Sequence, residues 1–326
     1  MLRNVKNPRF THFLCFKTDR NKSSQFIVII QAKPAMNQGK QAISTPVWRE
    51  VSSLQAWVLE ARSLGLRIGF VPTMGALHAG HAALIERAAA ACDRVVVSIF
   101  VNPTQFNEHA DFDNYPATPE ADLRVVEGAG GHAVFMPDVM EMYGDHAVAE
   151  AVDYGRLTRN WEAADRPGHF DGVVAIVDKL FQAVLPDVAF FGEKDLQQLA
   201  VVRRLAQERH PQVEVVGCAL VRDADGLALS SRNVRLTDEA RQTALAIPRS
   251  LRDLASHLAE GAAPLTATAT ARQTLEAMPG VEVAYFDLVH RDTFAPWSAE
   301  VPGPYFAVVA ATVGGVRLLD NQAVLP

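Results

Sequence analysis

Between residues 66 and 221, stretches rich in apolar residues alternate with segments that have helical periodicity. The five apolar stretches are LRIGFVPT, RVVVSIFVN, GHAVFMP, PDVAFFG and VEVVGCALV. Strands that are apolar throughout are buried on both faces, and helices between them join parallel neighbours. The alternation therefore predicts an α/β fold with a doubly wound, Rossmann-like parallel sheet, which we assign to residues 47–220.

Helical segments precede and separate these strands, and the first opens the regular part of the chain. Segment 47–65 has helical spacing and ends at Gly65, a residue type that commonly terminates helices. Four further helices are expected at 81–93, 118–130, 170–184 and 194–209. Each lies between two predicted strands, as connections between parallel strands require.

The pattern changes after about residue 220, where we expect a short hinge and then a smaller α+β domain over 221–326. A long helix is expected over 237–261, with Thr237 as its N-cap. The other elements, a helix and three strands, are expected at 264–278, 281–289, 305–313 and 316–321. The last two strands are joined by the turn residues Gly314 and Gly315.

Composition excludes several classes of protein. The chain has 326 residues, a net charge of −6 and 49% hydrophobic residues, so a nucleic-acid partner is not expected from charge. No apolar run approaches the ~18–20 residues of a membrane helix, so no membrane association is expected. The three cysteines form no CxxC pair, which favours a reducing, cytoplasmic setting over a disulfide framework.

Residues 1–46 differ from the rest of the chain. Their first half is basic and almost free of acidic residues, and a short apolar stretch, QFIVIIQA, follows it. We expect a disordered extension, or residues upstream of a natural start at Met36. A transit peptide is the alternative.

The segments that follow the predicted strands are the richest in reactive side chains. They are PTMGALHAGH, NPTQFN, GEKDLQQ and RDADGLALSSRN. In doubly wound folds, ligands bind beyond the carboxyl ends of the strands. Position and chemistry therefore predict one ligand site built from these segments.

The first of these segments carries two histidines at the start of a helix. His78 and His81 lie three residues apart, and Gly75 and Gly80 allow close approach of the backbone to a ligand. A helix N-terminus with histidine donors suits a phosphate group. Three other interpretations are a metal-binding pair, ordinary loop histidines and a pair of helix-capping groups.

Lys194 is a second candidate, because it opens a helix where a cation opposes the helix dipole. That placement is expected if an anion binds there, and Gln198, one turn on, would face the same way. Asp195 beside it could be a simple N-cap.

Two further segments offer polar groups. Ser230, Ser231 and Arg232 supply two hydroxyls and a guanidinium in a row, which can hold a polyphosphate, although a plain loop is the alternative. Gln105 offers an amide for hydroxyls or a carboxylate. No Walker A loop, dinucleotide-binding glycine pattern or G-x-S-x-G elbow is present, which argues against a P-loop NTPase or an NAD dehydrogenase.

Five segments together resemble the pantoate–β-alanine ligases, the pantothenate synthetase family. They are PTMGALHAGH, FVNPTQF, RPGHFDGV, FFGEKDLQQL and DGLALSSRN, in that order, and LLDN at 318–321 also fits. The HAGH stretch is similar to the HxGH signature of the wider nucleotidyltransferase group. The LSSRN stretch resembles the mobile loop of that group.

The resemblance implies that pantoate and ATP form pantoyl adenylate and pyrophosphate, and that β-alanine then displaces AMP to give pantothenate. It implies Mg²⁺, a homodimer and a catalytic set of His81, His78, Lys194 and Arg232. Gln105 and Gln198 would bind pantoate, Gln105 also β-alanine, and Asp122 the metal. The residues implied for ATP are Met74, Gly75, Ala76, Leu77, His78, Ala79, Gly80, His81, Gly192, Glu193, Lys194, Asp195, Val221, Leu229, Ser230, Ser231 and Arg232.

The chain departs from the family pattern at three positions. Ala117 stands where arginine is common, Leu229 where methionine is common and Ala175 where threonine is usual. None of them removes a catalytic candidate. Two rival functions are transfer of a nucleotide to a phosphorylated alcohol and nucleotide-dependent regulation without turnover.

Overall fold

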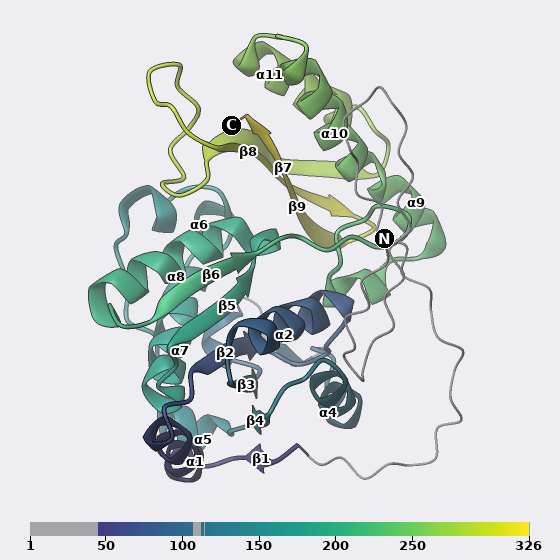
Figure 1. The fold of residues 1–326 in the computed structure, drawn as a ribbon. Helices are drawn as coiled ribbons and strands as arrows, with labels where there is room; N and C mark the ends of the chain where they lie inside the picture. Colours follow the sequence, from purple (N-terminus) through teal and green to yellow (C-terminus); the bar gives the residue numbers. More distant parts are fainter. Residues whose placement is uncertain (1–44, 107–111, 114, 326) are drawn as a thin grey trace, which may run out of the picture. The chain divides into compact units, whose positions relative to one another are not determined.

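The parallel sheet expected from the apolar stretches is present in the computed structural model, which describes residues 45–106, 112–113 and 115–325. Within those ranges the sheet has the strand order β1-β4-β3-β2-β5-β6, and every pairing is parallel (Figure 1). The strands are β1 (Val47–Trp48), β2 (Ile68–Thr73), β3 (Arg94–Ile99), β4 (Ala133–Phe135), β5 (Val188–Gly192) and β6 (Glu214–Cys218). The predicted Rossmann-like fold is confirmed.

Helices cover both faces of this sheet. On one face, α1 (Val51–Ser63), α7 (His169–Val184) and α8 (Leu196–Arg209) share a core with the sheet. On the other face, α2 (Ala79–Ala91) and α4 (Pro119–Gly128) do the same. The shorter elements are η1 (Pro103–Gln105), α5 (Val139–Tyr143), η2 (Gly155–Thr158), α6 (Glu162–Asp165) and η3 (Glu193–Asp195).

The first helix begins later than its spacing predicted. Helix α1 starts at Val51, and Val47 and Trp48 instead pair with Val134 and Phe135 of β4. A valine followed by a tryptophan suits a strand at a sheet edge. Tertiary pairing therefore overrides the local helical pattern at these two positions.

The C-terminal part carries a second sheet, which is antiparallel. Its strands are β7 (Val281–His290), β8 (Tyr305–Val313) and β9 (Val316–Leu325), in that order. Gly314 and Gly315 join the last two strands with φ angles of 56° and 73°, which only glycine adopts without strain. The predicted Gly-Gly hairpin turn is thereby confirmed.

The long helix expected over 237–261 is two helices. Helix α9 (Asp238–Ala244) ends before Leu245, and α10 (Ala246–Ala259) follows. Pro248 has no N–H and its ring disfavours a continuous helix through residue 244, but it is tolerated in the first turn of α10. The predicted cap holds, because the Thr237 side chain accepts the N–H of Ala240 at 3.1 Å.

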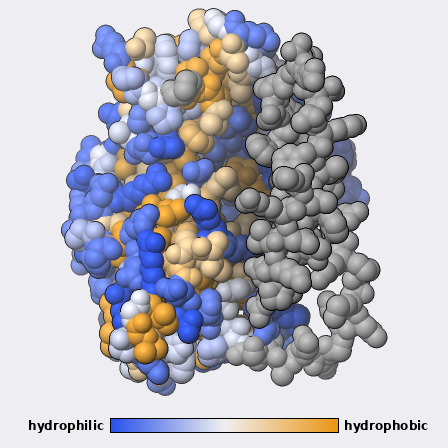
Figure 2. All heavy atoms as spheres, in the orientation of Figure 1, coloured by the Kyte–Doolittle hydropathy of each residue, from blue (hydrophilic) through white to orange (hydrophobic). Residues whose placement is uncertain are grey.

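Helices α10 and α11 (Pro264–Glu276) bury their apolar faces in the same core as the second sheet. Exposed large hydrophobic residues are scattered over separate elements, and Figure 2 shows hydrophobic and hydrophilic residues mixed on the face drawn. Across the described part of the chain, the helices are too short or too polar to span a bilayer.

Two expectations about organisation stay predictions. The extension 1–46 lies almost wholly outside the described residues. The division between 47–220 and 221–326 separates the two sheets, but residues 43–326 belong to one compact unit. The last strand, β9, contacts both η3 and η4 (Ser231–Arg235), so the second sheet borders the ends of strands from the first.

Candidate active site

A cavity of about 900 Å³ lies at the carboxyl ends of the parallel strands. Its wall comes from segments after β2, β3, β5 and β6, from helices α6 and α7 and from β9 of the second sheet. The predicted site residues in this wall are Met74, His78, Gly80, His81, Gln105, Gly192, Lys194, Asp195, Gln198, Val221, Leu229, Ser230, Ser231 and Arg232. The structure thus brings together most of the predicted set.

Six predicted residues do not line the cavity. They are Gly75, Ala76, Leu77, Ala79, Asp122 and Glu193. Gly75, Leu77, Ala79 and Glu193 are immediate chain neighbours of lining residues, and Ala76 lies two residues from Met74 and from His78, so these five shape the backbone of the wall. Asp122 is the exception and has a different place in the fold.

Both histidines cap helix α2. Nδ1 of His78 accepts the N–H of Gly80 at 3.1 Å, and Nδ1 of His81 accepts the N–H of His78 at 3.3 Å. A methyl group on Gly80 would come within 2.9 Å of the His78 ring, so glycine allows this ring to fold over the backbone. The capping interpretation is therefore correct, and it leaves the outer edge of each ring for another partner.

The hydrogen bonds also determine which ring nitrogen carries hydrogen. Burial, followed by the charges of neighbouring groups, lowers the pKa of His78 and lowers that of His81 to about 3, so both rings are neutral at pH 7. Because each Nδ1 accepts an N–H, the hydrogen of each neutral ring lies on Nε2. Two neutral Nε2–H donors are thus available beside the N-terminus of α2.

Asp122 holds the segment that leads into α2. It is 1% exposed, and its carboxylate accepts the N–H groups of Ala76 at 3.1 Å and Leu77 at 2.8 Å. Thr118 donates a third hydrogen bond at 3.1 Å. Asp122 lies outside the cavity wall and its carboxylate holds the backbone before α2, so this geometry does not support its prediction as a metal ligand.

Lys194 and Asp195 lie in the short turn η3 between β5 and α8. Asp195 stands at the N-cap of α8, but its side chain makes no capping hydrogen bond; it accepts from Lys194 Nζ at 3.2 Å. Partial burial alone would raise the pKa of Asp195, but Lys194 and Arg232 outweigh it and the pKa lies below its ordinary value. The pair is therefore ionic and faces the cavity.

Ser230 and Ser231 introduce an ordered turn and not an open loop. Ser230 caps η4 by accepting the N–H of Arg232 at 3.3 Å. Ser231 Oγ lies 3.4 Å from the hydroxyl of Tyr115. Leu229 is tied back by its N–H to the carbonyl of Val221 at 3.0 Å, so the adjoining segments form one wall.

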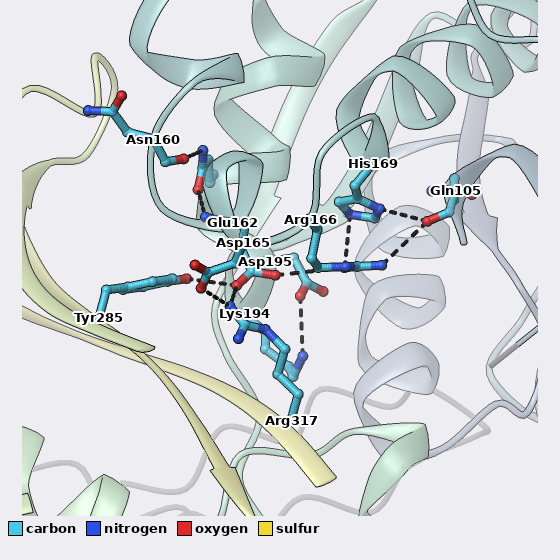
Figure 3. Close-up of polar contacts among 11 residues, drawn as sticks. Gln105, Asn160, Glu162, Asp165, Arg166, His169, Lys194, Asp195, Tyr285 and Arg317 are labelled. Carbon is cyan, nitrogen blue, oxygen red and sulfur yellow. Dashed lines mark hydrogen bonds and ion pairs between the residues drawn. The ribbon is translucent and has the colours of Figure 1, made fainter. Parts of the chain in front are cut away.

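Two residues that were not singled out hold the backbone of Gln105. His169 Nδ1 lies 3.0 Å from the Gln105 carbonyl, and Arg166 Nη2 donates to the same oxygen at 3.4 Å (Figure 3). Burial, and then the charge of Arg166, lowers the pKa of His169 to about 3. A neutral ring with hydrogen on Nδ1 donates to this carbonyl and accepts from Arg166 Nη1 at 3.2 Å. RPGHFDGV marks this region, but only the fold shows its contact with Gln105.

A buried carboxylate connects this group to the second sheet. Glu162, with 6% of its side chain exposed, accepts from Tyr285 of β7 at 3.3 Å and from Arg317 of β9 (Figure 3). Arg317 also pairs with Asp165 at 2.8 Å, and Arg166 lies 3.7 Å from the other Glu162 oxygen. No local pattern links positions more than 100 residues apart, so sequence reasoning missed this cluster.

The lining of the cavity is of two chemical kinds, which we call its apolar end and its polar end. The apolar residues are Pro72, Phe100, Val173, Ile176, Val177, Leu180 and Phe191, and all but Pro72 belong to the core that α7 shares with the sheet. The polar residues include His78 and His81 at the N-terminus of α2, Lys194 and Arg232, and the amides of Gln105 and Gln198 also line the cavity. Such a cavity can hold a small branched, hydroxylated molecule next to a polyphosphate.

Fold and site together define a Rossmann-like α/β protein with an anion-binding ligand cavity at the carboxyl ends of its strands. A family model described as "Pantoate-beta-alanine ligase" matches residues 46–323. The chain belongs to the pantoate–β-alanine ligase family, and the resemblance in its five motifs is confirmed.

Relatives match over nearly their whole length. The pantothenate synthetase of Paracoccus denitrificans is 46% identical over 283 residues, which cover 86% of this chain and 99% of the relative. A Thermus thermophilus pantothenate synthetase structure has a TM-score of 0.79 at 41% identity and covers 86% of this chain and 100% of its own. A Francisella tularensis ligase, described as complexed with "Beta-gamma ATP and Beta-alanine", has a TM-score of 0.70 at 30% identity, with 86% and 98% covered.

Proposed function

We propose that this chain condenses pantoate with β-alanine at the expense of ATP, through pantoyl adenylate, to give pantothenate, AMP and pyrophosphate. The observation that carries the proposal is the mixed lining of one cavity, which combines an apolar wall and two glutamines with two histidines, Lys194 and Arg232. Membership of the ligase family and the ligand-bound Francisella relative support the same reaction.

The apolar end suits pantoate. Its aliphatic and aromatic wall matches the two methyl groups of that substrate, and burial of those methyls contributes to affinity. Gln105 and Gln198 then offer amide donors and acceptors to the hydroxyls and the carboxylate. We also assign Gln105 to β-alanine.

The polar end suits the phosphates of ATP. The Nε2–H groups of His78 and His81 are donors that need no proton transfer to act, and they lie at the positive end of the α2 dipole. Lys194 and Arg232 add positive charge at the same end of the cavity. We assign the ribose to Asp195, the adenine end to Val221, and closure over the triphosphate to the segment 229–232.

The chemistry then needs no protein nucleophile. The pantoate carboxylate attacks the α-phosphorus in line, and the bond to pyrophosphate breaks. Negative charge grows on the departing pyrophosphate, where the histidines, Lys194 and Arg232 stabilise it. The amine of β-alanine next attacks the acyl carbon, and AMP leaves as the carbon–nitrogen bond forms.

Magnesium enters the proposal as a companion of ATP. The described residues include no group of three or more His, Cys, Asp or Glu side chains placed to hold a metal ion. Mg²⁺ commonly binds substrate phosphates and water with few protein ligands. We therefore assign no residue of this chain to the metal and route no step through it.

The homodimer and the cytoplasmic setting also stay predictions.

The test is pyrophosphate release by the purified protein from ATP and Mg²⁺, with and without pantoate, followed by addition of β-alanine. We expect release only with pantoate, and sustained turnover to pantothenate and AMP once β-alanine is present. Release that ignores pantoate would refute the proposal and favour another acceptor, such as a phosphorylated alcohol.

A further inference from the structure

The turn that carries Lys194 receives little support from its own sequence. Turn η3 is three residues long, and neither Gly192 before it nor Asp195 at the start of α8 supplies a side-chain cap. A lysine side chain has four rotatable bonds, so the place of its ammonium group depends on a fixed backbone. The support comes from elsewhere in the chain.

Asn321 of β9 provides that support across the gap between the two sheets. Its side-chain Nδ2 donates to the carbonyl of Glu193 at 2.7 Å and to the carbonyl of Lys194 at 3.1 Å. Asn321 is 5% exposed, so these bonds are shielded from water. One side-chain amide therefore donates hydrogen bonds to two successive peptide groups of η3.

Asn321 is itself held rigidly. Its N–H donates to Asp320 Oδ1 at 2.7 Å, and its carbonyl accepts from Arg222 at 3.2 Å. Arg222 also binds both oxygens of Asp320, at 2.7 and 2.8 Å, in the two-pronged geometry that restricts both side chains. Asp320 is 4% exposed. The side-chain amide that binds η3 is therefore held in place by Arg222, which follows the cavity residue Val221 in the chain.

We propose that Asn321 is a positioning residue for Lys194. The inference rests on the proposed function, in which Lys194 stabilises the charge of the departing pyrophosphate. Asn321 does not line the large cavity and acts through the backbone of η3. Loss of its amide lets the ammonium group of Lys194 shift relative to the phosphates, and misplacement by about 1 Å can cost about 100-fold in rate.

The experiment is a double-mutant cycle that combines Asn321→Ala with Lys194→Ala. Single-turnover formation of pantoyl adenylate and pyrophosphate is followed with enzyme in excess over labelled ATP, with saturating pantoate and no β-alanine. In the protein that keeps Lys194, we expect Asn321→Ala to lower this rate about 10- to 100-fold. In the Lys194→Ala protein, Asn321→Ala should change the rate by less than about twofold, because the ammonium group that Asn321 positions is gone.

Controls separate positioning from folding and from failure of the proposed function. Gln322→Ala, at the next position of β9 and outside the cavity, should leave the rate within about twofold. If Asn321→Ala does not fold, Asn321→Asp, which keeps the shape and loses the donor, replaces it in the same cycle. Equal rate losses in both backgrounds, or none in the first, would overturn the inference. If the unmodified protein shows no pantoate-dependent release, the proposed function fails, and the inference fails with it.

Discussion

At the residue scale, His78 and His81 cap helix α2, which is one of the interpretations that the sequence left open. Each ring uses Nδ1 for the cap, so its Nε2–H takes no part in it. The capping role is therefore compatible with the ligand role that we propose for both residues. Residue types and spacing predicted the donors, but the protonated nitrogen depends on the hydrogen bonds of the folded helix start.

His81→Ala tests this assignment. We expect the rate of pantoate-dependent pyrophosphate release to fall about 10²- to 10³-fold, the usual effect of removing one donor to a developing charge. ATP binding, measured by calorimetry, should persist because other donors remain in the wall. His146→Ala, at an exposed position outside the cavity, is the control. An unchanged rate in His81→Ala would refute the role.

His169 should make stability depend on pH. Its pKa is about 3 in the folded protein against 6.5 ordinarily, so below pH 6.5 the unfolded chain binds a proton that the folded one does not. Its contribution is therefore fully present above pH 6.5 and is lost as the pH falls toward 3. From pH 7 to pH 5 the loss is about 2 kcal/mol.

Urea unfolding at both pH values checks this dependence. The unmodified protein should lose more stability between pH 7 and pH 5 than His169→Gln, by about 2 kcal/mol. Equal losses in the two proteins would show that the ring is protonated in the folded state, against the hydrogen bonds described here.

At the element scale, the turn η1 rests directly on helix α7. A methyl group on Gly172 would lie 2.1 Å from the carbonyl oxygen of Thr104 and 2.8 Å from the nitrogen of Gln105. Asn102 adds a hydrogen bond to the Gly172 carbonyl at 3.1 Å. This glycine therefore allows the close approach that places Gln105 in the cavity wall.

Gly172→Ala should displace η1 and weaken pantoate binding. We expect the KM for pantoate to rise at least about tenfold, because the turn cannot keep its position against the new methyl group. Gly128→Ala is the matched control, since nothing lies within 4 Å of a methyl group at that position of α4. A KM within about twofold of the unmodified protein would contradict this packing account.

Elements were predictable where the signal is local. Apolar stretches located strands β2 to β6 of the parallel sheet, and Thr237 correctly marked the start of α9. The strand at Val47–Trp48 was missed because its only evidence is pairing with a distant strand. The contact of Asp122 with residues 76 and 77 was also missed, because backbone N–H groups leave no side-chain pattern to recognise.

At the scale of the whole molecule, the second sheet contributes side chains to the site of the first. Arg317 reaches Glu162 and Asp165, and Asn321 reaches η3. Such contacts depend on how two sheets meet, which no spacing in the sequence encodes. That residues following the strand ends line one cavity was predictable, whereas their supports on β9 were not.

Arg317→Ala should destabilise the protein more than an ordinary surface change. Removing the guanidinium leaves the buried carboxylate of Glu162 without its closest cation, which costs about 3 kcal/mol. Arg272→Ala, which breaks an exposed pair with Glu276, should cost less than about 1 kcal/mol. Urea unfolding measures both changes, and equal small losses would mean that the Glu162 cluster does not join the sheets.

The central claim is the route through pantoyl adenylate. Its most direct test is to follow an oxygen atom from pantoate to AMP. Pantoate labelled with ¹⁸O in its carboxylate is converted with ATP, Mg²⁺ and β-alanine, and the products are analysed by mass spectrometry. Attack of the carboxylate on the α-phosphorus predicts one ¹⁸O atom in each AMP formed. Label in pyrophosphate or inorganic phosphate, or AMP without label, would contradict the pantoyl adenylate route and the assignment of the cavity to it.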